Sequence, residues 1–180
     1  MNKFEYCLFF IGIALAGSIN AQAVTLDANG ILRNDDGTIR YMNLDEALQS
    51  CPRGTHLPTV RELARDAQSR GAKGILETSQ VNPNQVSPFV IKVSAVDPNG
   101  RLDEFYYDYR GYQRPMGDLG NNNFWSSSSV ARPIQFNSGY VLSHWRAVGH
   151  APDYPRENGG IYEAYRIYKG YAVRCFQNRQ

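Results

Sequence analysis

Residues 43–71, NLDEALQSCPRGTHLPTVRELARDAQSRG, decide the fold because they carry the start signals of two short helices. Asn43 can cap the first helix, and Glu46 completes a capping box three residues later. Thr59 and Glu62 repeat this pattern at the start of the second helix. We therefore expect two neighbouring helices in the first third of the chain.

The apolar residues of both segments recur at the three- and four-residue spacing of a buried helix face. In the first segment this face consists of Leu44, Ala47, Leu48 and Cys51. In the second segment it consists of Val60, Leu63, Ala64 and Ala67. Pro52 and Gly71 are expected to end the two helices. The pattern thus places Cys51 on the buried side of the first helix end.

The segments around these helices favour β-strands and tight turns. Asn29-Gly30 and Asp36-Gly37 predict hairpins with a positive φ at both central positions. Residues 89–96 (FVIKVSAV) predict a strand, and residues 97–100 (DPNG) predict the turn after it. A tyrosine-rich segment, residues 103–112, then follows.

The last third of the chain also indicates β-structure. Residues 124–127 predict one strand, and residues 137–139 (NSG) predict the turn of a hairpin within residues 134–142. Residues 171–176 predict a single closing strand. The order of elements favours one α+β domain over residues 24–180, with two early helices and a later antiparallel sheet.

The composition of the 180 residues excludes several classes of protein. Apolar residues make up 42% and aromatic residues 12%, which is enough for a core and excludes a disordered chain. The formal net charge of +2 lacks the basic excess of a general nucleic-acid binder. A collagen-like chain, a coiled coil and a polytopic membrane protein are also excluded.

Residues 1–23 have the pattern of a signal peptide. Lys3 supplies positive charge near the start, and an apolar run follows from Cys7 to Gly17. Residues 21–23 (AQA) form a small-residue cleavage pattern, so we expect the mature chain to begin at Val24. The protein is therefore expected in the periplasm, at the cell surface or outside the cell, with no membrane span in the mature chain.

Two cysteines, Cys51 and Cys175, remain after the signal peptide. In an oxidising compartment such a pair favours a disulfide over a metal site or a catalytic thiol. Two free thiols are the alternative. The disulfide would place the end of the chain beside its first third.

Four short motifs, in this order, resemble one bacterial family. The first helix leads to Cys51, and residues 54–63 (GTHLPTVREL) are similar to the family pattern G-x-x-L-P-T-x-x-E-L. Residues 124–128 (FWSSS) are similar to its W-S-S strand, and residues 172–175 (AVRC) are similar to its terminal V-R-C. The chain thus resembles the bacterial Lcl C-terminal domain family, which is related to the Fibrobacter major paralogous domain. This resemblance implies a C-type-lectin-like fold in an exported or surface protein, and several family members are suspected adhesins.

A cluster of aromatic and basic residues is the first candidate ligand-binding site. Tyrosine is rigid and amphipathic, its ring can stack on sugars, and arginine binds carboxylate or sulfate groups. The cluster consists of Tyr106, Tyr107, Tyr109, Arg110 and Tyr112. Trp145 and Arg146 form a second candidate, for which a half-buried tryptophan is the structural alternative. A structural alternative remains for the first cluster, because every second aromatic residue of a strand faces the core.

The residue types of metal and catalytic sites occur without the required spacing. Many C-type lectins bind sugar through calcium, and residues 97–99 (DPN) resemble one part of such a site, but two serines follow Trp125 where a carboxylate is needed. Residues 126–129 (SSSS) lack the G-x-S-x-G turn of a serine nucleophile. No spacing of a transition-metal site connects the histidines His56, His144 and His150. We therefore expect no cofactor, no metal and no catalytic residue.

Together these features predict a non-catalytic, calcium-independent recognition or adhesion module. It would bind a glycan or a surface protein through the loops of residues 97–123 and 143–160. Nucleic acid is not an expected partner. Two alternatives remain: a structural partner or tip subunit of a surface fibre, and a secreted enzyme of unknown class.

Overall fold

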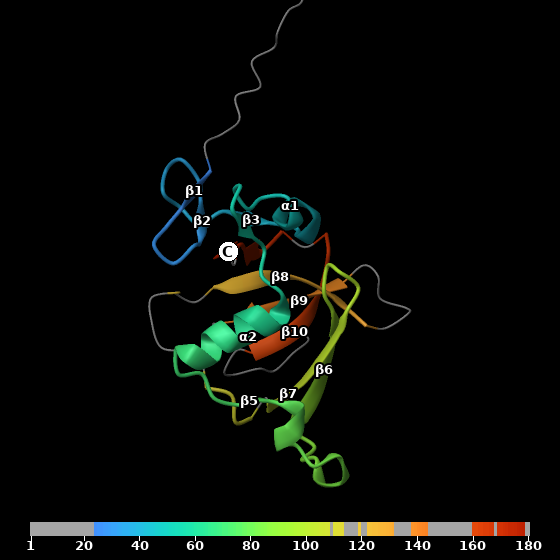
Figure 1. Cartoon of the computed structure of the whole chain (residues 1–180). Coiled ribbons are helices and arrows are strands. Elements are labelled where there is room, and N and C mark those ends of the chain that lie inside the picture. The colour runs from blue at the N-terminus through green and yellow to red at the C-terminus, as the bar shows by residue number, and fades with distance from the viewer. Residues whose placement is uncertain are drawn as a thin grey trace, which may run out of the picture.

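The computed structural model describes residues 24–108, 110–113, 119, 122–131, 138–143, 160–167 and 169–178. The expected signal peptide, residues 1–23, lies outside these ranges. The described residues form a mixed α+β fold, in which two early helices precede a mainly antiparallel sheet (Figure 1). The predicted fold class is thereby confirmed at this level.

The helices α1 (Leu44–Leu48) and α2 (Val60–Ser69) occupy the segment that the capping boxes predicted. In both helices the cap side chain, Asn43 or Thr59, accepts the main-chain N–H of the glutamate three positions later. The glutamate side chain in turn accepts the N–H of the cap residue, so both capping boxes are complete. The predicted buried face of α2 is also confirmed, and it consists of Val60, Leu63, Ala64 and Ala67.

The first helix is shorter than its apolar spacing predicted. It ends at Leu48, which is exposed, and Cys51 lies in the bend that follows. A helix of five residues has too few turns to bury four positions on one face, so only Leu44 and Ala47 are buried. The second helix ends as predicted, with Gly71 in the left-handed conformation (φ 88°) just after it.

The main sheet contains the strands β5 (Ile75–Leu76), β6 (Val90–Val96), β7 (Leu102–Asp108), β8 (Asn123–Val130), β9 (Ser138–Ser143) and β10 (Gly160–Tyr165). Their order in space is β10-β9-β8-β6-β7-β5, and each neighbouring pair is antiparallel. Strand β11 (Tyr171–Ala172) pairs in parallel with β8 and antiparallel with β3 (Tyr41–Met42). The last part of the described chain therefore lies beside the first.

Shorter elements complete the fold. Strands β1 (Thr25–Leu26) and β2 (Leu32–Arg33) form one small antiparallel sheet, and β4 (Thr55–His56) and β12 (Phe176–Gln177) form another. Two 3₁₀ helices, η1 (Thr78–Gln80) and η2 (Pro83–Gln85), connect β5 to β6. This connection lies at the end of the molecule farthest from β1 and β2 in Figure 1.

Two predictions for the last third were wrong. Ser138 and Gly139, expected in a turn, begin strand β9, because β10 pairs with both of them. Residues 171–176 form two short strands rather than one. The reason is a change of partner: Val173 and Cys175, between the two strands, hydrogen-bond to the β1–β2 region.

The first predicted hairpin is present, but its loop has three residues rather than two. The N–H of Gly30 donates to the carbonyl of Asp27 (2.9 Å), and the N–H of Asp27 donates to the carbonyl of Ile31 (3.0 Å). In such a loop only the glycine needs a positive φ, and its φ is 75°. Gly37 and Gly100 close two further turns through equivalent hydrogen bonds.

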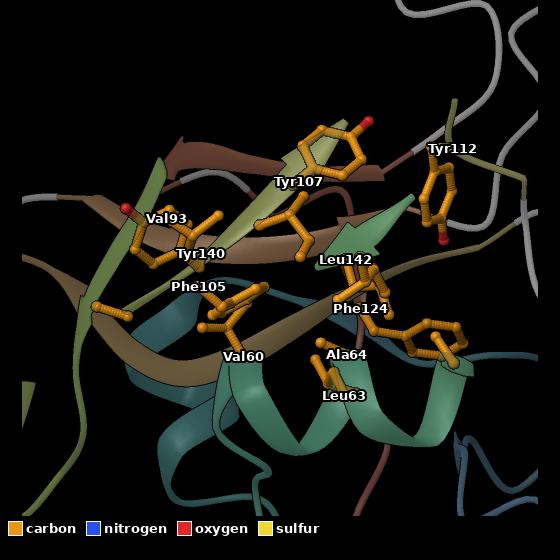
Figure 2. Packing of buried hydrophobic residues seen from close by; sticks show 14 of the residues in the cluster. Val60, Leu63, Ala64, Val93, Phe105, Tyr107, Tyr112, Phe124, Tyr140 and Leu142 are labelled. Carbon is orange, nitrogen blue, oxygen red and sulfur yellow. The ribbon is translucent and has the colours of Figure 1, made fainter. Parts of the chain in front are cut away.

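Helix α2 packs against one face of the main sheet. Figure 2 shows its residues Val60, Leu63 and Ala64 pointing toward Phe105 of β7 and Phe124 of β8. A second buried cluster surrounds Trp125 of β8, whose indole N–H donates to the carbonyl of Met42 (2.8 Å). The Trp125 ring meets Tyr171 of β11 edge to face, with the ring centroids 4.8 Å apart.

The predicted disulfide between Cys51 and Cys175 is present, with the two Cα atoms 5.6 Å apart and a sequence separation of 124 residues. Beside it, the buried side chain of Arg174 contacts the Asp66 carboxylate of α2 and donates to the carbonyl of Asn29 (2.7 Å). The covalent bond and the ion pair together hold residues 171–176, the closing segment, against the first third of the chain. In the part that the structure describes, no helix is long and apolar enough to cross a membrane.

Candidate recognition surface

The hairpin of β6 and β7 carries two of the predicted binding residues, Tyr106 and Tyr107, and places them on opposite faces. Lys92 lies opposite Tyr106, and Ile91 lies opposite Tyr107. Opposite residues of an antiparallel pair share a face, and consecutive residues alternate between faces. Tyr106 and Tyr107 therefore point to opposite sides of the sheet.

Tyr107 and Tyr112 belong to the core. Their exposed fractions are 0% and 1%, and their rings meet edge to face with the centroids 5.4 Å apart. Burial, with a smaller contribution from the phenol of Tyr107, raises the pKa of the Tyr112 phenol. Side chains with so little exposed surface do not offer a face to a ligand, so both residues are left out of the candidate surface. For these two tyrosines the structural alternative is therefore correct, because their side chains face the core.

Tyr106 lies on the other face, half-buried in a row that crosses three strands. Its neighbours in the row are Lys92 of β6 and Leu76 of β5. The Lys92 ammonium is 2.8 Å from the Glu104 carboxylate, which also accepts the hydroxyl of Ser94 (3.0 Å). The hydrogen bond that Lys92 donates to Glu104 is the main cause that raises the pKa of Lys92, so this lysine stays charged over the physiological range.

Arg110 lies just beyond the end of β7, and its guanidinium group stacks on the ring of Phe89. The guanidinium carbon is 3.3 Å from the ring centroid. The Asp108 carboxylate fixes the main chain here, since it accepts the N–H groups of Arg110 (3.0 Å) and Gly111 (2.9 Å). Arg110 is exposed and forms no ion pair with another described residue. We call Phe89, Lys92, Tyr106 and Arg110 the hairpin surface.

Phe89 and Lys92 are the two members of this surface that the sequence did not indicate as binding residues. The stretch 89–96 predicted a strand, and Phe89 counted as part of it. The register supplies the missing signal: Val90 lies opposite Asp108, so the residue before β6 meets the segment just after β7. Pairing partners are not visible in a single sequence.

Three predicted binding residues lie outside the part of the chain that the structure describes. They are Tyr109, Trp145 and Arg146, and most of the predicted 143–160 loop lies outside it as well. Their assignment as ligand-binding residues stays a prediction. Of the predicted set, the structure thus brings Tyr106 and Arg110 to one end of the hairpin and places Tyr107 and Tyr112 in the core.

The residues considered for calcium have structural roles. The Asp97 carboxylate accepts the main-chain N–H groups of Asn99 (2.9 Å) and Arg101 (2.8 Å) in the turn between β6 and β7. These hydrogen bonds, of which the one from Arg101 contributes most, lower the pKa of Asp97. The Trp125 side chain is fully buried. Within the described ranges, no group of three or more side chains is arranged to hold a metal ion.

Two of the four serines and the one described histidine also have structural partners. Ser126 donates its hydroxyl to the carbonyl of Tyr140 (2.7 Å), and the hydroxyl of Ser128 accepts the first N–H of α2 (3.0 Å). His56 meets Asn178 with one ring nitrogen (2.9 Å) and Glu62 with the other (3.3 Å). Both ring nitrogens of His56 therefore have partners among the described residues.

Comparisons of the chain with protein-family models, with curated proteins and with solved structures found no match.

Proposed function

We propose that this chain is an exported recognition module of C-type-lectin-like fold that binds a glycan or a surface protein without calcium and without catalysis. The α+β order and the disulfide from the end of the first helix to the closing segment support this fold. The disulfide is compatible with an oxidising compartment, and so supports export. The ligand would bind at the hairpin surface.

The observation that carries this proposal is the stacked pair of Arg110 and Phe89. Stacking fixes the plane of the guanidinium group while its N–H fork stays exposed. Such a fork binds carboxylate or sulfate groups through two parallel hydrogen bonds. Because the group is already oriented, little side-chain entropy is lost when a ligand binds.

The surroundings of this pair suit a hydroxyl-rich ligand. Tyr106 offers part of a ring at the same end of the hairpin, and aromatic rings can stack on sugar rings. The connection from β5 to β6 is rich in exposed amide and hydroxyl side chains, which adapt their hydrogen bonds to different partners. These side chains are Thr78, Ser79, Gln80, Asn82, Asn84, Gln85 and Ser87.

A glycan array that includes acidic polysaccharides, read with and without EDTA, tests the proposal. We expect binding that resists EDTA and weakens with salt, since an exposed guanidinium group is screened by ions. Arg110→Ala should weaken binding about tenfold or more, the loss expected for a charge-assisted hydrogen bond. Phe89→Ala should weaken it less, because the guanidinium group remains but loses its orientation.

Arg101→Ala is the matched control. Arg101 is also exposed and lies in the same hairpin, but at the turn end, away from Phe89. It changes the net charge as Arg110→Ala does. Equal losses in the two variants would show that binding follows total charge and not the hairpin surface. Binding that is abolished by EDTA would contradict the calcium-independent proposal.

One observation favours the alternative of a structural partner in a surface assembly. Tyr165, the last residue of β10, and Ile167, two residues later, are 74% and 82% exposed. The turn that carries them is fixed to α1, because Arg166 forms an ion pair with Asp45 and its carbonyl accepts the N–H of Leu44 (2.9 Å). Large apolar side chains held outward in this way are typical of protein contacts. Sedimentation velocity separates the candidates, since association lost in Ile167→Ser would favour the assembly.

A further inference from the structure

Among the described residues, strand β6 is paired along its whole length on one side and along only part of its length on the other. Toward β7, pairing covers Val90–Val96, whereas toward β8 it covers Ala95 and Val96. One more hydrogen bond, from the N–H of Ala131 to the carbonyl of Ser94 (3.1 Å), ends this ladder. In Figure 1 the hairpin of β6 and β7 accordingly runs away from β8, and only its turn end lies beside that strand.

The main chain of Lys92 points toward this open side. Along a strand the N–H and C=O groups of alternate residues face the same neighbour, so Lys92 faces the side that Ser94 faces. The carbonyl of Ser94 accepts the Tyr140 hydroxyl there (3.1 Å), and the N–H of Val90 donates to Ser87 (2.9 Å). Between them, the N–H and C=O of Lys92 meet no main-chain partner among the residues described here.

The side chains along this edge differ between the two faces of the sheet. Ile91 is 38% exposed, although Val93 and Tyr107 on the same face are buried. Ile91 therefore presents apolar surface at the margin of the core. On the other face the Lys92 side chain is 46% exposed, and its ammonium group has donors beyond the one that Glu104 uses.

We propose that the open half of β6 binds an extended peptide segment of a partner protein as an added strand. The N–H and C=O of Lys92, which have no main-chain partner among the described residues, are the groups to which an extended peptide would hydrogen-bond. A partner residue opposite Lys92 shares its face and would be acidic. The residues on either side of it would be apolar, because they share the face of Ile91.

This inference does not depend on the hairpin surface as a glycan site. The peptide site uses the main chain of β6, whereas the proposed glycan site uses the guanidinium group of Arg110. Arg110→Ala should therefore weaken glycan binding and leave peptide binding unchanged. The two proposals can fail separately.

Amide hydrogen exchange of the ¹⁵N-labelled protein, followed by NMR, tests the open edge first. The amide of Lys92 should exchange about tenfold or more faster than those of Ile91 and Val93, whose N–H groups face β7. A Lys92 amide that exchanges as slowly as its two neighbours would overturn the proposal, because the edge would then already be covered in the free protein.

The peptide acetyl-Thr-Val-Glu-Val-Thr-amide is the probe for binding, and acetyl-Thr-Val-Lys-Val-Thr-amide is its matched control. We expect the glutamate peptide to slow exchange at Lys92 and to bind about tenfold more tightly than the lysine peptide. Equal affinities, or chemical shift changes that avoid residues 90–94, would contradict the proposal.

Two variants separate main-chain from side-chain recognition. Lys92→Pro removes the outward N–H without removing a hydrogen bond to β7, and should weaken binding of the glutamate peptide about tenfold. Lys92→Glu keeps the N–H and should make the protein bind the lysine peptide more tightly than the glutamate peptide. This second variant tests the proposal even if the proline variant does not fold. Unchanged binding in both variants would exclude this edge as the peptide site.

Discussion

At the scale of single residues, the hydroxyl of Tyr112 shows what the core requires of its aromatic side chains. The side chain is almost fully buried, and its oxygen has no hydrogen-bond partner in the described structure. The ring contacts Tyr107 edge to face, so the aromatic body and not the hydroxyl stabilises this position. A buried polar atom without a partner costs free energy on folding.

Tyr112→Phe should therefore raise the free energy of unfolding by about 1 kcal/mol, because it removes the unpaired oxygen and keeps the ring. Urea denaturation measures the change. Tyr140→Phe is the matched control, since the Tyr140 hydroxyl donates to the carbonyl of Ser94 (3.1 Å) and its loss should lower stability by about 1 kcal/mol. A loss of stability in Tyr112→Phe would show that its hydroxyl has a partner in solution.

Asp66 connects stability to pH at the same scale. Burial opposes its charged form, but hydrogen bonds from Arg174 and Arg70 outweigh burial and lower its pKa. A carboxylate whose pKa is lower in the folded state stabilises the fold above its unfolded pKa of about 3.9. This contribution is lost as the pH falls through the lowered pKa.

Between about pH 5 and pH 2 the natural protein should thus lose more unfolding free energy than Asp66→Asn does. At neutral pH the variant should be less stable by about 3 kcal/mol, because the buried Arg174 is left without its carboxylate partner. Chemical denaturation at a series of pH values measures both effects. Parallel pH profiles for the two proteins would contradict this assignment.

At the scale of elements, the helix starts and the turns were predictable because their signals are local. The capping residues of α1 and α2 and the glycine of the turn after β6 act within five residues. The prediction was wrong for Ser138 and Gly139, because β10 pairs with them and overrides their turn preference. The alternation of side chains along β7 places Tyr107 in the core. The tyrosine-rich sequence alone did not indicate which of its tyrosines would face the core.

The glycines of two similar turns should differ in their tolerance of a side chain. A Cβ atom at Gly30 would lie 2.5 Å from the carbonyl oxygen of Cys175, whereas a Cβ atom at Gly37 would meet nothing within 4 Å. Both residues have a positive φ, so alanine costs about 1 kcal/mol at either position from backbone strain.

Gly30→Ala should therefore cost clearly more than Gly37→Ala in thermal denaturation, by about 2 kcal/mol or more, because the closing segment must also move. In the Gly30 variant we also expect faster amide exchange at Cys175, whose N–H donates to Gly30 (2.8 Å). An equal loss of unfolding free energy in the two variants would contradict this prediction, because it would mean that the closing segment can move away from Gly30 without destabilising the fold.

At the scale of the whole molecule, the sequence predicted the composition of the fold but not its arrangement. The pairing of Cys51 with Cys175 was predictable because the export pattern left two cysteines. The strand order was not predictable, since β11 joins β3 and β8 from distant parts of the chain. For the same reason the sequence did not indicate Phe89 as the partner of Arg110.

Replacing both cysteines by serine should lower the free energy of unfolding by about 4–5 kcal/mol, since the closed loop spans a sequence separation of 124 residues. Guanidinium denaturation of the natural and doubly substituted proteins, each with and without reductant, measures this. Reductant should destabilise only the natural protein. If the free energy of unfolding of the natural protein stayed the same after its disulfide had been fully reduced, the expected contribution of the disulfide would be contradicted.

The disulfide also determines how the molecule would carry mechanical load. Residues 52–174 lie inside the covalent loop, and the strands of the hairpin surface lie among them. Tension applied between Val24 and Asn178 would extend the short flanking segments and then pass through the sulfur–sulfur bond. The hairpin would remain folded under a pull that straightens both flanks, so a bound ligand would be held until the disulfide broke or the ligand itself dissociated.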